Sequence, residues 1–193
     1  VLDNKCVENK LVAIGVRNGS DVYIGRNELV RTGGMPPMIA VREDSSAVVT
    51  DNTIIGGGVA GVMVQGTAAI SGNQFRGNGP RAGGPPNFAA WIHGGSNVSF
   101  FNNRTDRWRH ALFAGCANQI WATDNTTSNF LGTAIVVDKS KQPAHVFGNI
   151  ALSDRENDKA ATVKGLQGIV GENVQKVPEP SKADEKADAS TGS

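Results

Sequence analysis

Histidine and arginine side chains lie close to large aromatic residues in the middle of this 193-residue chain. His93, Arg107 and His110 carry groups that can accept a proton or stabilise charge, and histidine is the most frequent general base near neutral pH. We assign these three residues as candidate catalytic groups, with His93 as the first choice. Trp91 and Phe113 flank them in the sequence, and aromatic faces of this kind pack well against sugar rings.

Arginine dominates the cationic side chains of the same region. Between Leu11 and Asp138 every basic residue other than histidine is arginine. The planar guanidinium can bind a carboxylate or a sulfate through two parallel hydrogen bonds. The candidate substrate-binding residues are Trp91, Phe113, Arg76, Arg81, Arg109 and Asp138. Together they predict a groove whose partner is an acidic polysaccharide.

The elements that position these residues are short strands in a long repeat. An asparagine recurs at intervals of 21 to 30 residues, at Asn4, Asn27, Asn52, Asn73, Asn103, Asn125, Asn149 and Asn173. The positions five and three residues before each asparagine, and two residues after it, are mostly apolar. This alternation predicts a strand, a sharp corner and a short return strand. Asparagine suits the corner because it tolerates left-handed backbone angles and its amide can satisfy turn groups.

A further apolar strand recurs midway between the asparagines, with inward pairs such as Ile39 and Val41 or Leu112 and Ala114. Stacked coils would place the asparagine amides in one line, each able to bond the next. The repeat therefore predicts an all-β fold, a right-handed parallel β-helix solenoid of about seven coils with an asparagine ladder. We assign residues 1–177 to this domain. Residues 178–193 are polar and charged, so we expect a disordered tail or linker.

With its asparagine corners and paired inward strands, the chain resembles the right-handed parallel β-helix superfamily, which contains pectate lyases and NosD-like repeat proteins. The resemblance implies an extracytoplasmic location, whether secreted, periplasmic or on the cell surface. It also implies lyase chemistry in which a basic residue takes the proton α to a uronate carboxylate, often with calcium. No capping helix precedes the first coil, so we expect residues 1–177 to be the C-terminal part of a longer solenoid.

Stacking predicts which outward side chains are neighbours on successive coils. One outward column contains Gly15, Ala40, Met63, Trp91, Phe113, Val136 and Thr162. The next contains Arg17, Arg42, Gln65, His93, Gly115, Asp138 and Lys164. Gly115 would leave a gap in the second column. The turns are expected to gather Arg76, Arg81, Arg107, Arg109 and His110 along one edge of the apolar column.

A hydrolase mechanism with two carboxyl groups fits this arrangement poorly. Glycoside hydrolysis needs two carboxyl groups roughly 5 to 9.5 Å apart. Asp106 and Asp138 are predicted to lie on different sides of the strand, in coils that are not adjacent. No acidic cluster accompanies the histidines, so we predict no metal ligands and no cofactor, and calcium is implied by the resemblance alone.

The outward apolar column has two explanations. It is either a binding groove or a surface covered by the glycine- and proline-rich insertion at 76–86 or by another chain. Three hypotheses follow: a polysaccharide lyase or epimerase, a non-catalytic binding or adhesion module, and a structural β-helix that packs on an upstream domain or forms an oligomer. We favour interaction with acidic polysaccharide, and the sequence leaves catalysis open.

Composition excludes two other classes of partner. The formal net charge of +1 gives no electrostatic footprint for nucleic acid. No run of 18 apolar residues occurs, so we predict no membrane-spanning segment.

Overall fold

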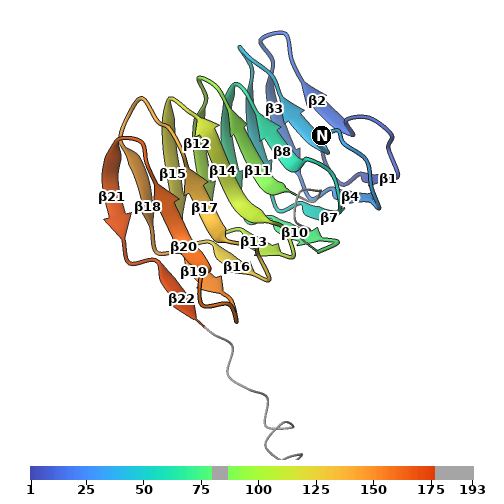
Figure 1. Ribbon diagram of the computed structural model, residues 1–193. Helices are drawn as coiled ribbons and strands as arrows, with labels where there is room; N and C mark the ends of the chain where they lie inside the picture. The colour runs from blue at the N-terminus through green and yellow to red at the C-terminus, as the bar shows by residue number, and fades with distance from the viewer. Residues whose placement is uncertain (80–86, 177–193) are drawn as a thin grey trace, which may run out of the picture.

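The computed structural model describes residues 1–79 and 87–176, which form a parallel β-solenoid without any helix (Figure 1). Its strands fall into three parallel sheets, two of them with seven strands, so the solenoid has seven coils. The predicted all-β parallel solenoid is thus confirmed. The predicted tail, residues 178–193, and residues 80–86 of the insertion lie outside the described residues.

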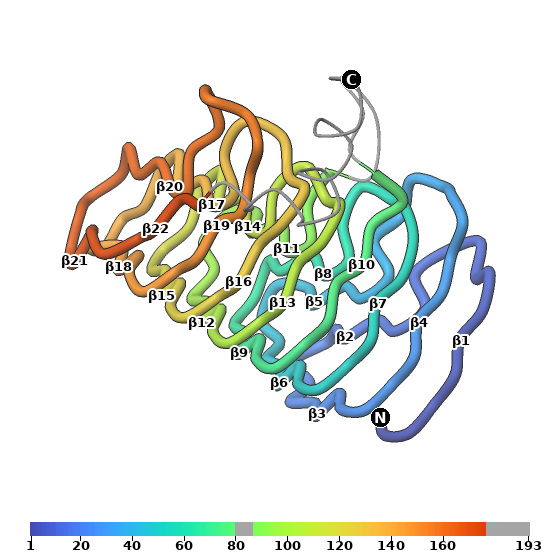
Figure 2. The backbone as a smooth tube through the Cα atoms, turned by 90° about the horizontal axis from the view of Figure 1, so that it is seen from below, coloured from blue at the N-terminus to red at the C-terminus, as the bar shows by residue number. Residues whose placement is uncertain are grey.

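Each of the seven coils contributes one strand to each sheet, and β22 adds an eighth strand to the first of them; each sheet is named after its first strand. The β1 sheet contains β1 (Lys5–Val7), β4 (Glu28–Arg31), β7 (Thr53–Gly56), β10 (Gln74–Gly77), β13 (Arg104–Asp106), β16 (Thr126–Ser128), β19 (Ile150–Leu152) and β22 (Val174–Lys176). The β2 sheet contains β2 (Ile14–Val16), β5 (Ile39–Val41), β8 (Ala60–Val64), β11 (Phe88–His93), β14 (His110–Cys116), β17 (Thr133–Val137) and β20 (Lys159–Val163). The β3 sheet contains β3 (Asp21–Gly25), β6 (Ser46–Thr50), β9 (Thr67–Ser71), β12 (Asn97–Phe101), β15 (Gln119–Thr123), β18 (Ala144–Phe147) and β21 (Gln167–Gly171). Figure 2 shows the coils lying side by side in chain order, from the first at one end to the last at the other.

The asparagine ladder runs through all eight predicted corners. Each asparagine from Asn4 to Asn149 donates a hydrogen bond from Nδ2 to Oδ1 of the next, with Nδ2–Oδ1 distances between 2.8 and 3.1 Å. The predicted backbone role of these asparagines is wrong. The positive φ angle belongs to the residue before each one, at Asp3, Arg26, Asp51, Gly72, Asn102, Asp124, Gly148 and Glu172. Asparagine is therefore at the corner for its side-chain hydrogen bonds.

Inward side chains from the three sheets form one continuous core. The predicted inward pairs of the β2 sheet are fully buried in its central coils, as at Val62 and Val64 or Leu112 and Ala114. Phe75 and Phe100 pack in the same core with their ring centroids 6.3 Å apart. Burial of such side chains, at roughly 1.5–3 kcal/mol each, is the main favourable contribution to the fold.

Trp108 extends this core beyond the strands. It lies in the turn between β13 and β14, yet its side chain is fully buried and packs with the core residues. Four of the five residues 106–110 are charged or titratable, a composition typical of a surface turn. The buried indole instead fixes the path of the chain just before His110, and so helps to position the start of β14.

Candidate functional site

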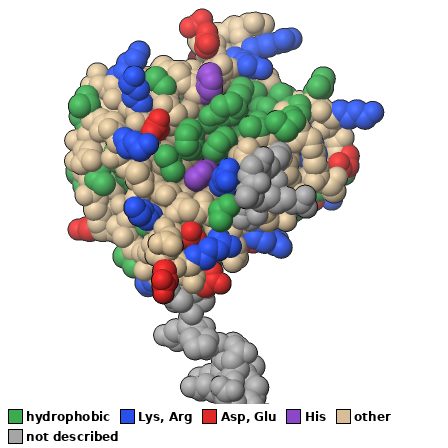
Figure 3. Space-filling model, viewed as in Figure 1, with side chains coloured by type: hydrophobic (Ala, Val, Ile, Leu, Met, Phe, Trp, Pro, Cys, Tyr) green, Lys and Arg blue, Asp and Glu red, His purple; other side chains and the backbone are tan. Residues whose placement is uncertain are grey.

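The cross-strand register confirms the predicted apolar column on the outer face of the β2 sheet. Met63 of β8 pairs with Trp91 of β11, and Trp91 pairs with Phe113 of β14. Phe88 of β11 likewise pairs with His110 of β14. We refer to Met63, Phe88, Trp91, His110 and Phe113 as the apolar strip. Figure 3 shows hydrophobic side chains gathered on this face, with histidine side chains at the border of the area.

Phe88 is at the centre of the strip, although sequence reasoning did not select it. Its ring centroid lies 4.9 Å from that of Phe113 and 5.7 Å from that of Trp91. The imidazole of His110 stacks on Phe88 at 5.7 Å with an interplanar angle of 16°. The signal that could have identified Phe88 is its spacing, since it stands three residues before Trp91 as His110 stands three before Phe113.

The residues of the strip differ in how far they are buried. Met63 was predicted to face solvent, but its residue is only 7% exposed because Val59, Phe88 and Trp91 pack around it. Ala40 in the preceding coil is 2% exposed. Trp91 and Phe113 are half-buried and keep part of their surface accessible. A ligand on this face would therefore contact Trp91 and Phe113 together with Phe88 and His110, which are half-buried as well.

The ring of His110 is held in one tautomer. Nδ1 lies 2.6 Å from the carbonyl oxygen of Thr133, so Nδ1–H donates to that carbonyl and Nε2 keeps its lone pair. Burial lowers the pKa of His110, the neighbouring positive charge of Arg109 lowers it further, and the hydrogen bond to Thr133 opposes them. The imidazole is therefore neutral near pH 7, with Nε2 able to accept a proton or a hydrogen bond.

His93 stands at the other end of β11, where the predicted register fails. The pairing of β11 with β14 shifts between Ile92 and His93, so His93 pairs with Cys116. The second column therefore passes through Cys116 and not through Gly115, and the predicted gap at Gly115 is wrong. The imidazole of His93 is exposed and meets Trp91 edge to face, with ring centroids 5.1 Å apart.

The predicted arginine edge is not a single cluster. Arg109 directly precedes His110 of the strip, and its positive charge contributes to the lowered pKa of that imidazole. Arg107 instead pairs with Asp106 of the β1 sheet, with Nε 3.0 Å from Oδ2. Arg76 lies on β10 in the β1 sheet, where it pairs in register with Asp106. Arg81 lies outside the described residues.

Asp138, predicted to contact substrate, lies just beyond β17 at the far end of the second column. Its Oδ1 accepts from Nζ of Lys164 at 2.8 Å, and both side chains are exposed. The ion pair neutralises this end of the β2 sheet. The strand β14 lies between β17, which precedes Asp138, and β11, which ends at His93.

Two arginines that the predicted set omitted stand at the opposite end of the same face. Arg17 and Arg42 follow β2 and β5 on adjacent strands, and they border a hollow of about 290 Å³ whose floor includes Gly15 and Ala40. Nη1 of Arg42 donates to Oε1 of Gln65 at 2.8 Å. Their position in the second column was the available sequence signal. Arg17 and Arg42 therefore give this end of the face its positive charge.

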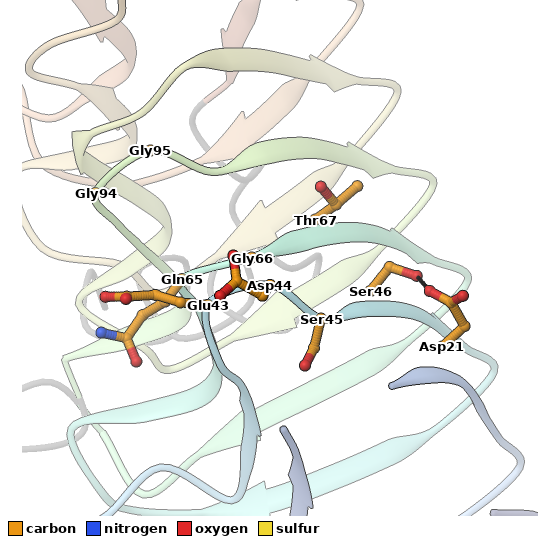
Figure 4. A pocket seen from close by; sticks show the side chains of 10 residues that line it. All are labelled: Asp21, Glu43, Asp44, Ser45, Ser46, Gln65, Gly66, Thr67, Gly94 and Gly95. Carbon is orange, nitrogen blue, oxygen red and sulfur yellow. Dashed lines mark hydrogen bonds between the residues drawn. The ribbon is translucent and has the colours of Figure 1, made fainter. Parts of the chain in front are cut away.

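An acidic hollow of about 490 Å³ lies past these arginines, in the turns that lead from the β2 sheet to the β3 sheet. Figure 4 shows the side chains of Glu43, Asp44 and Gln65 grouped on one side of it, and the bonded pair Asp21 and Ser46 on the other. Among residues 1–79 and 87–176, no group of three or more histidine, cysteine, aspartate or glutamate side chains is arranged to hold a metal ion. Because Arg17 and Arg42 border one hollow and Asp21, Glu43 and Asp44 line the next, the surface charge changes from positive to negative between Arg42 and Glu43.

A family model described as the right handed beta helix region matches residues 12–161. The chain therefore belongs to the right-handed β-helix family, which agrees with the parallel solenoid and fixes the expected hand of its coils. Searches of curated proteins and of solved structures find no match to the chain. Within the described part of the chain, no helix is long and apolar enough to cross a membrane.

Proposed function

We propose that this β-helix domain binds an acidic polysaccharide along the outer face of its β2 sheet. Sugar rings pack on Trp91 and Phe113, and a carboxylate or sulfate group of the polymer meets Arg17 and Arg42. The observation that carries the proposal is the register, which places the two half-buried aromatic side chains on adjacent strands in line with the arginine hollow.

The spacing of the coils favours a polymer over a small ligand. Parallel strands lie about 4.8 Å apart, which is close to the length of one sugar unit. A polysaccharide that runs parallel to the solenoid axis therefore meets one coil for each sugar. The aromatic side chains and the arginines then contact different sugars of the same chain.

The charges along the face give the polymer a preferred position. Arg17 and Arg42 are exposed and face no carboxylate within ion-pair distance among the described residues. At the other end Asp138 is already neutralised by Lys164. The guanidinium groups of Arg17 and Arg42 are therefore available to an anionic group of the polymer, whereas Glu43 and Asp44 beyond them would repel it. Because these side chains are exposed, added salt should weaken the contribution strongly.

Lyase or epimerase activity is the second candidate function, and the geometry of His110 favours it. A neutral imidazole with its Nε2 lone pair available can take the proton from the carbon α to a uronate carboxylate. In a lyase the electron pair of that C–H bond forms a carbon–carbon double bond, and the glycosidic oxygen leaves with a proton. Incubation with polyuronate tests this through the ultraviolet absorbance of unsaturated ends, which should be absent for His110→Gln.

Binding is tested on immobilised polygalacturonate and alginate, with neutral dextran as the uncharged control. The double variant Trp91→Ala/Phe113→Ala should bind the acidic polymers at least tenfold more weakly than the native chain. Its matched control is Phe101→Ala/Trp121→Ala, because these two aromatic residues are 43% and 38% exposed on the β3 sheet. Equal binding by all three proteins would refute the proposal.

The same variants separate binding from packing. If the strip instead covers another chain, Trp91→Asp should change the sedimentation coefficient of the protein in solution. A native chain that sediments as an oligomer, dissociates in Trp91→Asp and binds no acidic polymer would assign the strip to a structural interface. The proposed location outside the cytoplasm rests on the proposed ligand and the family resemblance.

A further inference from the structure

A separate hollow of about 290 Å³ lies on the outer face of the β1 sheet, between β10, β13, β16 and β19. Arg76, Arg104, Thr126 and Ser128 are among the residues that line it. Arg104 pairs in register with Gln74 on one side and with Thr126 on the other. Arg76 and Arg104 are therefore diagonal neighbours on adjacent strands, and both side chains are exposed.

The two guanidinium groups are largely uncommitted. Among the described residues, Nη2 of Arg76 donates to Oε1 of Gln74 alone, at 3.2 Å. Within residues 1–79 and 87–176, no carboxylate oxygen lies within 4.0 Å of the guanidinium of Arg104. Two exposed guanidinium groups that share a hollow repel each other, so an anion between them lowers the electrostatic energy of the pair.

Asp106 is the one acidic residue that lines the hollow, and its carboxylate is already occupied. Oδ1 accepts from Oγ of Ser128 at 2.9 Å and from Nδ2 of Asn129 at 2.7 Å, and Oδ2 accepts from Nε of Arg107 at 3.0 Å. Burial raises the pKa of Asp106, but these three donors outweigh it, so the pKa is lowered. The carboxylate therefore leaves both lining arginines free for an external anion.

We propose that this hollow binds an oxyanion group, the sulfate ester or the carboxylate of a glycan, through Arg76 and Arg104. Both guanidinium groups donate to the oxyanion, and the hydroxyl of Thr126 lies on the next strand beside Arg104. The site shares no residue with the apolar strip and belongs to another sheet, so its oxyanion binding is separate from the proposed function, while the choice of a glycan as the carrier rests on that function. A domain with both sites can hold two glycan segments at once.

The test follows the Nε–Hε resonances of the arginines by NMR during three titrations. The ligands are a sulfated oligosaccharide, an oligouronate and inorganic sulfate. A saturable shift of the Arg76 and Arg104 resonances with one of the two glycans supports the proposal and identifies the source of the oxyanion. Shifts with inorganic sulfate alone, or no saturable shift at these two residues, would overturn it.

Two variants make the test independent of total charge. Arg76→Gln/Arg104→Gln should weaken binding of the active glycan at least tenfold, whereas Lys139→Gln/Lys141→Gln removes the same charge from an exposed turn and should leave affinity within twofold. Equal losses in both variants would show unspecific attraction and refute the site. The double variant Trp91→Ala/Phe113→Ala should still show the ligand-induced shifts of the Arg76 and Arg104 resonances, also when it no longer binds polyuronate on the β2 sheet.

Discussion

Asn73 and Asn103 are separated by 30 residues, yet Nδ2 of Asn73 donates to Oδ1 of Asn103 across 3.0 Å. The insertion in this coil therefore leaves the corner of the solenoid undisturbed. Strand pairing is also continuous across it, because Gln74 pairs with Arg104 on β13 and with Thr53 on β7. Extra residues in a turn cost little when the strands on either side keep their partners. This continuity is what keeps Trp91 in line with Met63 and Phe113.

The ladder predicts a large loss of stability for Asn103→Ala. The Nδ2 of Asn103 donates to the carbonyl oxygens of Ile70 and Phe101 and to Oδ1 of Asn125, while its Oδ1 accepts from the backbone and side chain of Asn73. Alanine leaves these buried groups unpaired, so the free energy of unfolding should fall by about 3–5 kcal/mol. Urea unfolding measures it.

Asn4→Ala is the matched control, because Asn4 is the exposed first member of the ladder. Within the described part of the chain, its Nδ2 donates to the carbonyl oxygen of Leu2 and to Oδ1 of Asn27 and to no other acceptor. The expected loss of unfolding free energy is about 1 kcal/mol or less. Equal losses for the two variants would show that the buried ladder adds nothing beyond an exposed hydrogen bond.

The residue before a ladder asparagine offers a stabilising substitution wherever it is not already glycine. Asp124 has a φ angle of 58°, a conformation that costs energy for residues with a Cβ atom. Its side chain makes no hydrogen bond or ion pair with the described residues. Asp124→Gly should therefore raise the free energy of unfolding by about 0.5–1 kcal/mol. Thr123→Gly, in the adjacent extended strand β15, should lower it, and the same sign for both variants would exclude this account.

Arg31 is predicted to be essential for the first two coils. It is 4% exposed, and its guanidinium donates to the carbonyl oxygens of Leu11 and Pro36 in two different turns. Burial lowers its pKa, and the nearby carboxylate of Glu8 partly opposes that effect. Lysine cannot span both turns, so Arg31→Lys should lower the free energy of unfolding by about 2–4 kcal/mol.

Exposed Arg17 provides the comparison for this substitution. Arg17→Lys should unfold at the same urea concentration as the native chain. If Arg31→Lys also leaves the urea midpoint unchanged, the buried guanidinium does not hold the turns that precede β2 and β5.

His110 predicts a pH dependence of stability. Its pKa in the folded chain is lowered from 6.5, because burial disfavours the charged ring. Below pH 6.5 the unfolded chain therefore takes up this proton more readily, and stability falls as the pH decreases from about 7 towards the folded-state pKa. Asp106 contributes only at lower pH, since its pKa is lowered from 3.8.

Thermal unfolding from pH 7.5 to 5.5 checks this expectation. His110→Gln should lose less stability over that range than the native chain. The control His93→Gln, at an exposed site, still contains His110 and should lose as much stability as the native chain. If His110→Gln and the native chain show the same dependence of stability on pH, burial of the His110 ring does not oppose its protonation.

The sequence predicted the fold well because its main signals are periodic. Spacing alone located every ladder asparagine and the outward column from Gly15 to Thr162. It failed where a local event breaks the period, as at the shift between Ile92 and His93 that moves the pairing to Cys116. It gave no prediction for Trp108, since the inward direction of a turn residue depends on packing that no repeat encodes.

The candidate site was harder to predict than the fold for a related reason. Aromatic residues could be placed by strand register, but turn residues could not. Arg107 and Arg76 were assigned to the edge of the strip by proximity in sequence, whereas their side chains contact Asp106 and Gln74. Arg17 and Arg42 were in the predicted column and were overlooked because they lie far from Trp91 in sequence.

The indole Nε1–H resonances of the three tryptophans provide the most direct test of polysaccharide binding on the β2 sheet. Trp91 lies on the strip, Trp108 in the core and Trp121 on the β3 sheet, so each reports a different surface. Titration with an oligouronate should shift the Trp91 resonance saturably and leave those of Trp108 and Trp121 in place. A Trp91 resonance that stays fixed at saturating ligand, or a shift confined to Trp121, would contradict the account.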